Sequence, residues 1–152
     1  MEFLFVYGTL LSKFHHPLSI KLKKEGIYLG KGFVFGKLYD LGEYPAAKPA
    51  KDSIVIGEIY RVPAILFFDL DFYEDYNQYN LKKSLFVRKR TKSFLIPEDH
   101  HYANSQELIQ KLHEFQKIFS FIYWYNQPLN LAVWIESGDY LKYLEEKKQF
   151  SF

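Results

Sequence analysis

The sequence predicts an α+β fold built on a small mixed-sheet β-barrel that is flanked by helices. The chain has 152 residues, and a domain typically holds about 100–200, so we expect a single domain over residues 1–152. Predicted strands and helices follow one another without strict alternation, which favours an α+β arrangement. Glycines interrupt two of the predicted strands (Gly32, Gly36 and Gly57), and such glycines are typical of the bulges or sharp bends that a barrel needs.

In the N-terminal part of the chain, the pattern of apolar residues predicts three strands, at residues 2–7, 31–40 and 53–62, and the last two alternate loosely. The first is apolar on both faces, as in a central strand. Leu18 and Leu22 lie four residues apart and predict a short amphipathic helix over 17–24. A Gly- and Pro-rich loop is expected over 41–49, and dense Ile, Leu and Phe predict a helix from Ala64 to about Tyr76.

The C-terminal part continues the mixed pattern. Three further strands are expected, at residues 85–96, 118–125 and 131–135. Apolar residues at helical spacing predict a helix over about 106–117, with Asn104 or Ser105 as its N-cap. Ser137-Gly138-Asp139 opens a terminal helix over 140–149.

Composition excludes several classes of function. Apolar residues make up 48% and aromatic residues 20% of the chain, enough for a real core, and most aromatic side chains are expected to pack in it. Lys and Arg total 20 against 18 Asp and Glu, far from the excess of a dedicated nucleic-acid binder. The absence of cysteine excludes disulfides, thiolate catalysis and sulfur-ligated zinc.

The sequence also bears on location and partners. No basic segment precedes the first apolar stretch, so a secretory signal is not expected. No run approaches the roughly 20 apolar residues of a membrane helix. We therefore expect a cytoplasmic protein that binds neither a membrane nor nucleic acid. The oligomeric state is left open.

One acidic residue of the 64–76 helix is expected on an apolar face. Projected at 100° per residue, Glu74 falls between Leu70 and Phe67, whereas Asp71 and Asp75 form a solvated stripe. Asp69 also falls among apolar neighbours, so the projection leaves both Glu74 and Asp69 open. Burial raises the pKa of a carboxyl group and can make it a general base near neutral pH.

A second candidate feature is the turn after the first strand. Tyr7-Gly8-Thr9-Leu10 presents backbone N–H groups that can hold a carboxylate or an oxyanion, and glycine lets a ligand approach closely. It is not a phosphate loop, because spaced glycines with a lysine are missing.

Two other groups of residues are weaker candidates for a functional site. The five histidines are His15, His16, His100, His101 and His113. Neighbours in an extended chain point apart, so a metal site is not expected. Arg88, Arg90 and Lys92 share one face of a predicted strand, which fits a solvated face better than a binder of single-stranded nucleic acid.

Four segments carry a family resemblance by their order and spacing. They are Phe5-Val6-Tyr7-Gly8-Thr9-Leu10, then Gly36-Lys37-Leu38-Tyr39-Asp40-Leu41-Gly42 with Tyr44-Pro45, then Gly57-Glu58-Ile59-Tyr60, then Leu70-Asp71-Phe72-Tyr73-Glu74. Together they resemble the gamma-glutamylcyclotransferase-like family in its small bacterial-type members. Residues 85–88, 122–126 and 135–140 resemble the family's C-terminal half, so the likeness covers most of the chain.

The resemblance implies the fold predicted above, with a pocket closed by the Tyr7–Leu10 turn and Glu74, and it favours Glu74 over Asp69. In such enzymes the α-amine of a γ-glutamyl substrate attacks its own γ-carbonyl, which yields 5-oxoproline and releases an amine or amino acid without metal or cofactor. Glu74 would be the general acid/base. The amides of Gly8, Thr9 and Leu10 would bind substrate oxygens. The walls and hydrogen-bond donors would be Tyr7, Tyr44, Tyr123 and Tyr125.

Two departures from the family pattern motivate an alternative. Asp75 stands where the family usually has glycine, and residues 97–119 resemble a helical insertion that could lid the pocket or dock a partner. The alternative is a non-catalytic pocket protein of the same fold that binds a small carboxylate or a protein. The physiological substrate stays open in both.

Overall fold

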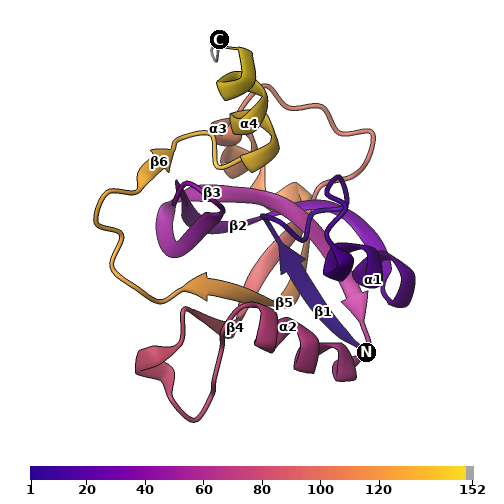
Figure 1. The fold of residues 1–152 in the computed structure, drawn as a ribbon. Coiled ribbons are helices and arrows are strands. Elements are labelled where there is room, and N and C mark those ends of the chain that lie inside the picture. The colour runs from indigo at the N-terminus through magenta and orange to yellow at the C-terminus, as the bar shows by residue number, and fades with distance from the viewer. Residues whose placement is uncertain (150–152) are drawn as a thin grey trace.

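The computed structural model describes residues 1–149 and has a six-stranded mixed sheet with helices around it (Figure 1). The strands are β1 (Glu2–Val6), β2 (Ile27–Asp40), β3 (Pro45–Val62), β4 (Phe86–Leu95), β5 (Gln116–Tyr125) and β6 (Val133–Ile135). The α-helices are α1 (Pro17–Glu25), α2 (Phe67–Tyr73), α3 (Ser105–Gln110) and α4 (Tyr140–Gln149). Short 3-10 helices span Ala64–Leu66, Leu81–Lys83 and Leu112–Glu114. The α+β fold class is therefore confirmed.

The sheet is ring-like. Its strand order is β3-β1-β5-β4-β2-β6, and β3 also pairs with β2. The pairing of β1 with β5 is parallel and the others are antiparallel. Gly57 permits the tight packing of β3 on β1, because a Cβ there would lie 2.1 Å from the carbonyl oxygen of Val6. A register shift between Phe35 and Gly36 marks a bulge, which is a common way to bend a strand.

The predicted bounds differ most from the observed ones at two places. The expected loop at 41–49 is mostly strand, because β3 begins at Pro45 and pairs with the far end of β2 as Asp40↔Pro45 through Gly36↔Pro49. Prolines are tolerated here because this end of β3 has no second partner strand among residues 1–149. The expected helix at 106–117 ends at Gln110, and residues from Gln116 onward belong to β5.

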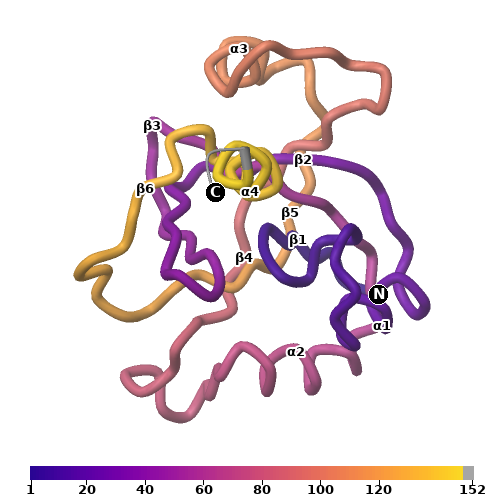
Figure 2. The backbone as a smooth tube through the Cα atoms, turned by 45° about the horizontal axis from the view of Figure 1, so that its top comes forward, coloured from indigo at the N-terminus to yellow at the C-terminus, as the bar shows by residue number. Residues whose placement is uncertain are grey.

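The second error has a tertiary cause. Phe115 leaves the helical path and packs edge-on against Phe33 at a ring distance of 5.6 Å. Gln116 and Lys117 then pair with the end of β4. Burial and sheet pairing thus override a helical pattern that the local sequence supports. The connection between β4 and β5, including α3, lies at the end of the molecule opposite α2 (Figure 2).

The aromatic side chains divide between core and surface. Phe5, Phe33, Phe67 and Phe115 are buried, as expected, and Phe3 and Phe35 pack partly buried against the core. Other aromatic residues, on the outer side of α2 and in the turn after it, are exposed. None of the helices within residues 1–149 is both long and apolar enough to cross a bilayer.

Candidate functional site

A cavity of about 270 Å³ opens where the C-terminal end of α2 meets the end of β1. Its lining residues come from five segments, namely Phe5–Leu10, Tyr44–Pro45, Tyr73–Glu74, Leu85–Phe86 and Tyr123. The cavity therefore collects residues that are far apart in the sequence. The lining residues include one ionisable carboxyl group and no Lys, Arg or His.

That carboxyl group belongs to Glu74, the residue at which α2 ends. Its backbone N–H donates to the carbonyl of Leu70 at 2.9 Å, which holds the residue in the last turn of the helix. Within residues 1–149 its carboxylate has no hydrogen-bond or ion-pair partner. Burial alone raises the pKa of Glu74 to about 8, because removal from water disfavours the charged form.

Asp69, the other residue that the helical projection left open, lies outside the cavity. Its side chain is exposed and forms an ion pair with Lys21 at 2.5 Å. Asp69 and Glu74 thus differ in solvation although both stand on apolar faces of the same helical projection. The reason is that only one of the two faces packs against the protein.

The turn after β1 contributes three consecutive residues, Gly8, Thr9 and Leu10, to the lining of the cavity. The N–H of Leu11 donates to the carbonyl of Gly8 at 3.0 Å and closes the turn. In the described part of the chain, no acceptor takes the amides of Gly8, Thr9 and Leu10. A Cβ on Gly8 would lie 2.8 Å from Cγ of Pro45, so glycine allows the turn to pack against the opposite wall of the cavity.

This turn is anchored by Glu58, a residue of one of the family segments to which the sequence analysis assigned no role. Glu58 of β3 is 7% exposed, and its two carboxylate oxygens accept from the backbone N–H and the hydroxyl of Ser12, both at 2.7 Å. Lys23 donates to the carbonyl of Ser12 at 2.7 Å. The available signal was a lone carboxylate inside the apolar run of residues 54–62, since buried charges are normally paired.

The hydroxyl groups of Tyr7 and Tyr123 are both engaged in the wall of the cavity. Tyr7 donates to the carbonyl of Tyr123 at 2.6 Å and accepts from the N–H of Ala47 at 3.3 Å. Burial, with a smaller contribution from Glu74, raises the pKa of Tyr7 well above its usual value. Tyr7 therefore joins β1, β3 and β5 at the base of the site.

Tyr123 donates to the carboxylate of Asp71 at 2.5 Å, and Arg88 pairs with the same carboxylate at 3.1 Å. Burial and the Asp71 carboxylate both raise the pKa of Tyr123 far above its usual range. The prediction that Asp71 lies on a solvated stripe is wrong, because Arg88 of β4 passes beneath α2 and its guanidinium lies 4.4 Å from the ring centre of Phe67.

The remaining tyrosines have different positions. Tyr44 lines the cavity, whereas Tyr125 is not among the lining residues and packs edge-on against Phe86. Tyr73, which sequence analysis did not assign to the site, shares a hydrogen bond of 2.6 Å with the hydroxyl of Thr9. This bond ties the amide turn to the end of α2, immediately before Glu74.

The two departures from the family pattern lie away from the cavity. Asp75 is exposed with φ of 54°, a left-handed conformation that glycine adopts without cost and Asp tolerates. The turn that a glycine would make is therefore made by Asp75. Residues 97–119 contribute no residue to the lining of the cavity. Leu108 and Phe115 from this segment are buried and pack against residues of β2, β3 and β4.

The basic strand face is largely neutralised. Besides the Arg88–Asp71 pair, Arg90 lies 3.4 Å from the carboxylate of Glu2. Across residues 1–149, no three His, Asp or Glu side chains are grouped so that they could hold a metal ion.

A family model and several solved structures match this chain. The family model described as "Gamma-glutamyl cyclotransferase, AIG2-like" matches residues 4–142. A search of curated proteins finds no significant match.

Among solved structures, an uncharacterized protein from Pyrococcus horikoshii superposes with a TM-score of 0.62 at 16% identity, over 100% of both chains. An AIG2-like protein from Mus musculus gives 0.59 at 23% identity, over 82% of this chain and 76% of that one. A gamma-glutamyl cyclotransferase gives 0.52 at 13% identity, over 99% and 88%. These structures share the fold.

Proposed function

Because the chain belongs to the gamma-glutamyl cyclotransferase, AIG2-like family, we propose that it cyclises a γ-glutamyl substrate with Glu74 as general acid/base. The observation that carries this proposal is the position of Glu74, a partly buried residue whose carboxyl group has no partner among residues 1–149, in the same cavity as the Gly8–Leu10 turn. The products would be 5-oxoproline and an amine or amino acid.

The reaction needs a folded substrate and a deprotonated amine. The α-nitrogen forms a bond to the γ-carbonyl carbon, and the bond from that carbon to the leaving nitrogen breaks. Both reacting groups belong to one molecule, so a cavity that holds the folded conformer removes much of the entropic barrier, up to about 7–11 kcal/mol in well-oriented systems.

Glu74 would transfer two protons, one after the other, from the attacking nitrogen to the leaving nitrogen. Its carboxylate would first accept a proton from the substrate α-ammonium, and the resulting carboxylic acid would donate it to the leaving nitrogen. The second proton, which the attacking nitrogen loses as the lactam forms, would follow the same route, so that the released amine departs as an ammonium ion and Glu74 is again a carboxylate. A pKa of about 8 suits both roles, because a carboxyl group with a low pKa would be a weak base for an ammonium ion. No water is consumed and no proton is gained overall.

The amides of Gly8, Thr9 and Leu10 would bind the negative oxygens. The α-carboxylate of the substrate, or the oxygen that becomes negative when the carbonyl is attacked, can accept from such a row of N–H groups. Anchoring of Ser12 by Glu58 holds these donors in place before the substrate arrives.

The non-catalytic alternative was motivated by Asp75 and by residues 97–119. Asp75 preserves a left-handed turn, and neither feature reaches the cavity. No specific contact in the site therefore favours a binding protein over an enzyme.

The direct test is release of 5-oxoproline from a panel of γ-glutamyl amines and γ-glutamyl dipeptides. We expect Glu74→Gln to lower kcat/KM by a factor of about 10² to 10⁴, the usual contribution of general acid–base catalysis. Asp69→Asn is the matched control, since it removes a carboxylate from the same helix outside the cavity, and it should leave kcat/KM unchanged.

Full activity of Glu74→Gln would refute the assigned mechanism. Binding of panel members without turnover by the wild-type protein, seen as a raised melting temperature, would instead support the non-catalytic alternative.

A further inference from the structure

The outer side of α2 and the turn that follows it form an exposed apolar surface. Phe68, Phe72 and Tyr79 are 78%, 89% and 89% exposed, and Ile65 and Leu81 extend the surface at its ends. We call these five residues the α2 outer face. The segment that carries them, α2 and the turn after it, runs along the lower edge of the molecule in Figures 1 and 2.

Neither the core nor the cavity uses this face. The opposite side of the helix is buried through Leu66, Phe67 and Leu70, and the helix end delivers Glu74 to the cavity. Aromatic side chains offer about 150–250 Å² each, so the α2 outer face exposes on the order of 600 Å² of apolar side chain. That is the upper end of what a monomer normally leaves in water.

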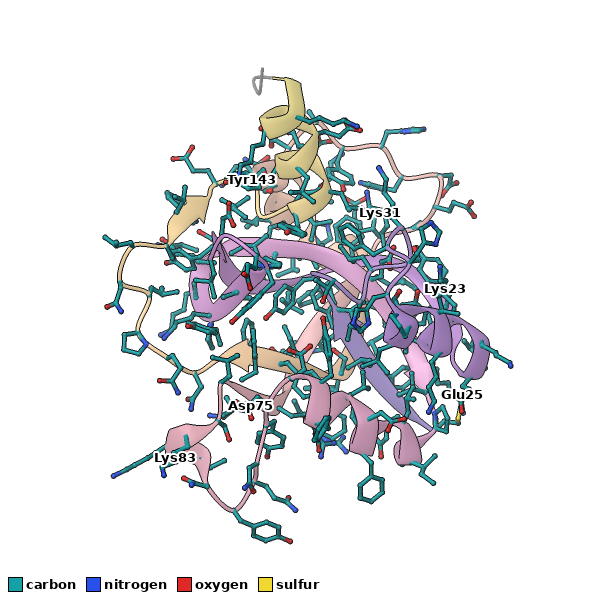
Figure 3. The ribbon with its side chains drawn as sticks, in the orientation of Figure 1. Lys23, Glu25, Lys31, Asp75, Lys83 and Tyr143 are labelled. Carbon is teal, nitrogen blue, oxygen red and sulfur yellow. The ribbon has the colours of Figure 1, made fainter. Side chains whose placement is uncertain are left out.

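The charges beside the face are arranged asymmetrically. At the start of α2 the carboxylates of Glu25 and Asp69 share a single lysine, Lys21. At the other end Lys82 and Lys83 are exposed and have no ion-pair partner among residues 1–149. Figure 3 shows Glu25 at one end of this edge and Lys83 at the other, with Asp75 between them.

We propose that the α2 outer face is the contact between two copies of this chain, related by a two-fold axis with their α2 helices antiparallel. A two-fold axis brings the same surface of both copies together, with opposite ends aligned. The basic end of one copy then meets the acidic end of the other, while Phe68 and Phe72 pack at the centre. The surface is thus complementary to itself in charge as well as in polarity.

The area and the charges favour a second copy over a lipid surface. A stable dimer buries about 800 Å² on each partner, of which the five apolar side chains supply most and the charged ends the rest. An anionic lipid surface would attract Lys82 and Lys83 but repel the carboxylates of Glu25, Asp69 and Asp75. This proposal does not depend on the proposed enzymatic function.

The test is sedimentation equilibrium of the full chain between about 1 and 200 µM, a range that reports affinities of standard interfaces. We expect a concentration-dependent dimer. Phe72→Glu should raise the dimer Kd at least about 50-fold, because it places a charge at the centre of an apolar contact. Phe119→Glu, a charge added to an exposed phenylalanine on β5, should change Kd less than about twofold.

A double substitution, Lys82→Glu with Lys83→Glu, tests the charge pairing. It alters only exposed lysines, so it remains informative if Phe72→Glu does not fold, and it should raise Kd about tenfold. A wild-type chain that stays monomeric at the highest concentration would overturn the proposal. The proposal would also be overturned if Phe119→Glu weakened the dimer as much as Phe72→Glu does. A third contrary result would be a chain that forms no dimer but binds phosphatidylglycerol vesicles, with that binding abolished by Phe72→Glu.

Discussion

At the end of α2, Glu74 is partly buried and its carboxyl group has no compensating partner among residues 1–149. A buried carboxyl group in this position costs stability when it ionises. Proteins retain such groups mainly at functional sites, where the shifted pKa serves proton transfer. The contrast with Asp69, which is exposed and paired with Lys21, shows how strongly the surroundings decide the chemistry of one residue type.

The pH dependence of the proposed reaction follows from the raised pKa of Glu74. In the proposed mechanism the carboxylate accepts the ammonium proton, so activity would require ionisation of Glu74, and this group ionises as the pH rises through about 8. We expect kcat/KM for 5-oxoproline release to rise about tenfold per pH unit below 8 and to level off above it. A profile that is flat between pH 6 and 8.5 would exclude Glu74 as the base.

Asp75 gives a second prediction for a single residue. Its left-handed φ of 54° destabilises the folded state of a residue that has a Cβ, whereas glycine adopts this conformation without strain. Glycine also gives the unfolded chain more freedom, but this effect is smaller than the strain that it relieves. We expect Asp75→Gly to raise the free energy of unfolding by up to about 1 kcal/mol.

Asp75→Ala, which keeps a Cβ but cannot form local hydrogen bonds, should lower the free energy of unfolding. Urea denaturation of both variants measures the difference. If Asp75→Gly destabilises the protein by more than Asp75→Ala, the left-handed turn is not what matters at this position.

At the scale of elements, the turn after β1 depends on β3. Glu58 binds Ser12 through two hydrogen bonds of 2.7 Å, and hydrogen bonds to a charged group contribute about 1.5–3 kcal/mol each. Thr9 and Tyr73 tie the same turn to α2. The amide donors and Glu74 are thereby held relative to each other by two separate contacts.

We expect Glu58→Gln to raise KM for a γ-glutamyl substrate about tenfold, because the amide group offers one acceptor oxygen where the carboxylate offers two. Ser12→Ala, which keeps the N–H donor, should raise KM less. The pH at which kcat/KM levels off should not move in either variant, since Glu74 is untouched. Unchanged KM in a folded Glu58→Gln variant would show that the turn does not need this anchor.

At the scale of the whole molecule, the ring-like sheet separates two ends. The cavity lies where α2 meets β1, and the connection between β4 and β5 packs at the opposite end around Leu108 and Phe115. We therefore expect substitutions around Leu108 to change the free energy of unfolding without changing the activity proposed for the cavity, as is usual for distant sites without shared partners.

Leu108→Ala tests this separation. Leu108 is fully buried, so its truncation should lower the free energy of unfolding by about 2–5 kcal/mol. With the assay kept well below the melting temperature, kcat/KM should stay within about twofold of the wild-type value. A large loss of kcat/KM in the folded variant would mean that residues 97–119 do influence the cavity.

The α+β fold class, and the Tyr7–Leu10 turn that lines the cavity, follow from local sequence. Strand alternation, glycine in turns and helical spacing depend on neighbours along the chain, so they can be predicted from it. The terminal helix at 140–149 is a clear example, because its observed bounds match the predicted ones. The helix predicted at 106–117 is a counterexample, because pairing with β4 decides where β5 begins.

Helical spacing places Leu70 and Glu74 on one face of α2 and Asp69 and Phe72 on another, and this can be derived from the order of the residues. Which of these faces packs against the protein and which meets water depends on how α2 docks in the tertiary structure. A helical projection gives relative directions but no position for the core, and two apolar faces look alike in it. The same docking partly buries Glu74, pairs Asp71 with Arg88 across 17 positions of sequence, and leaves Phe72 in solvent.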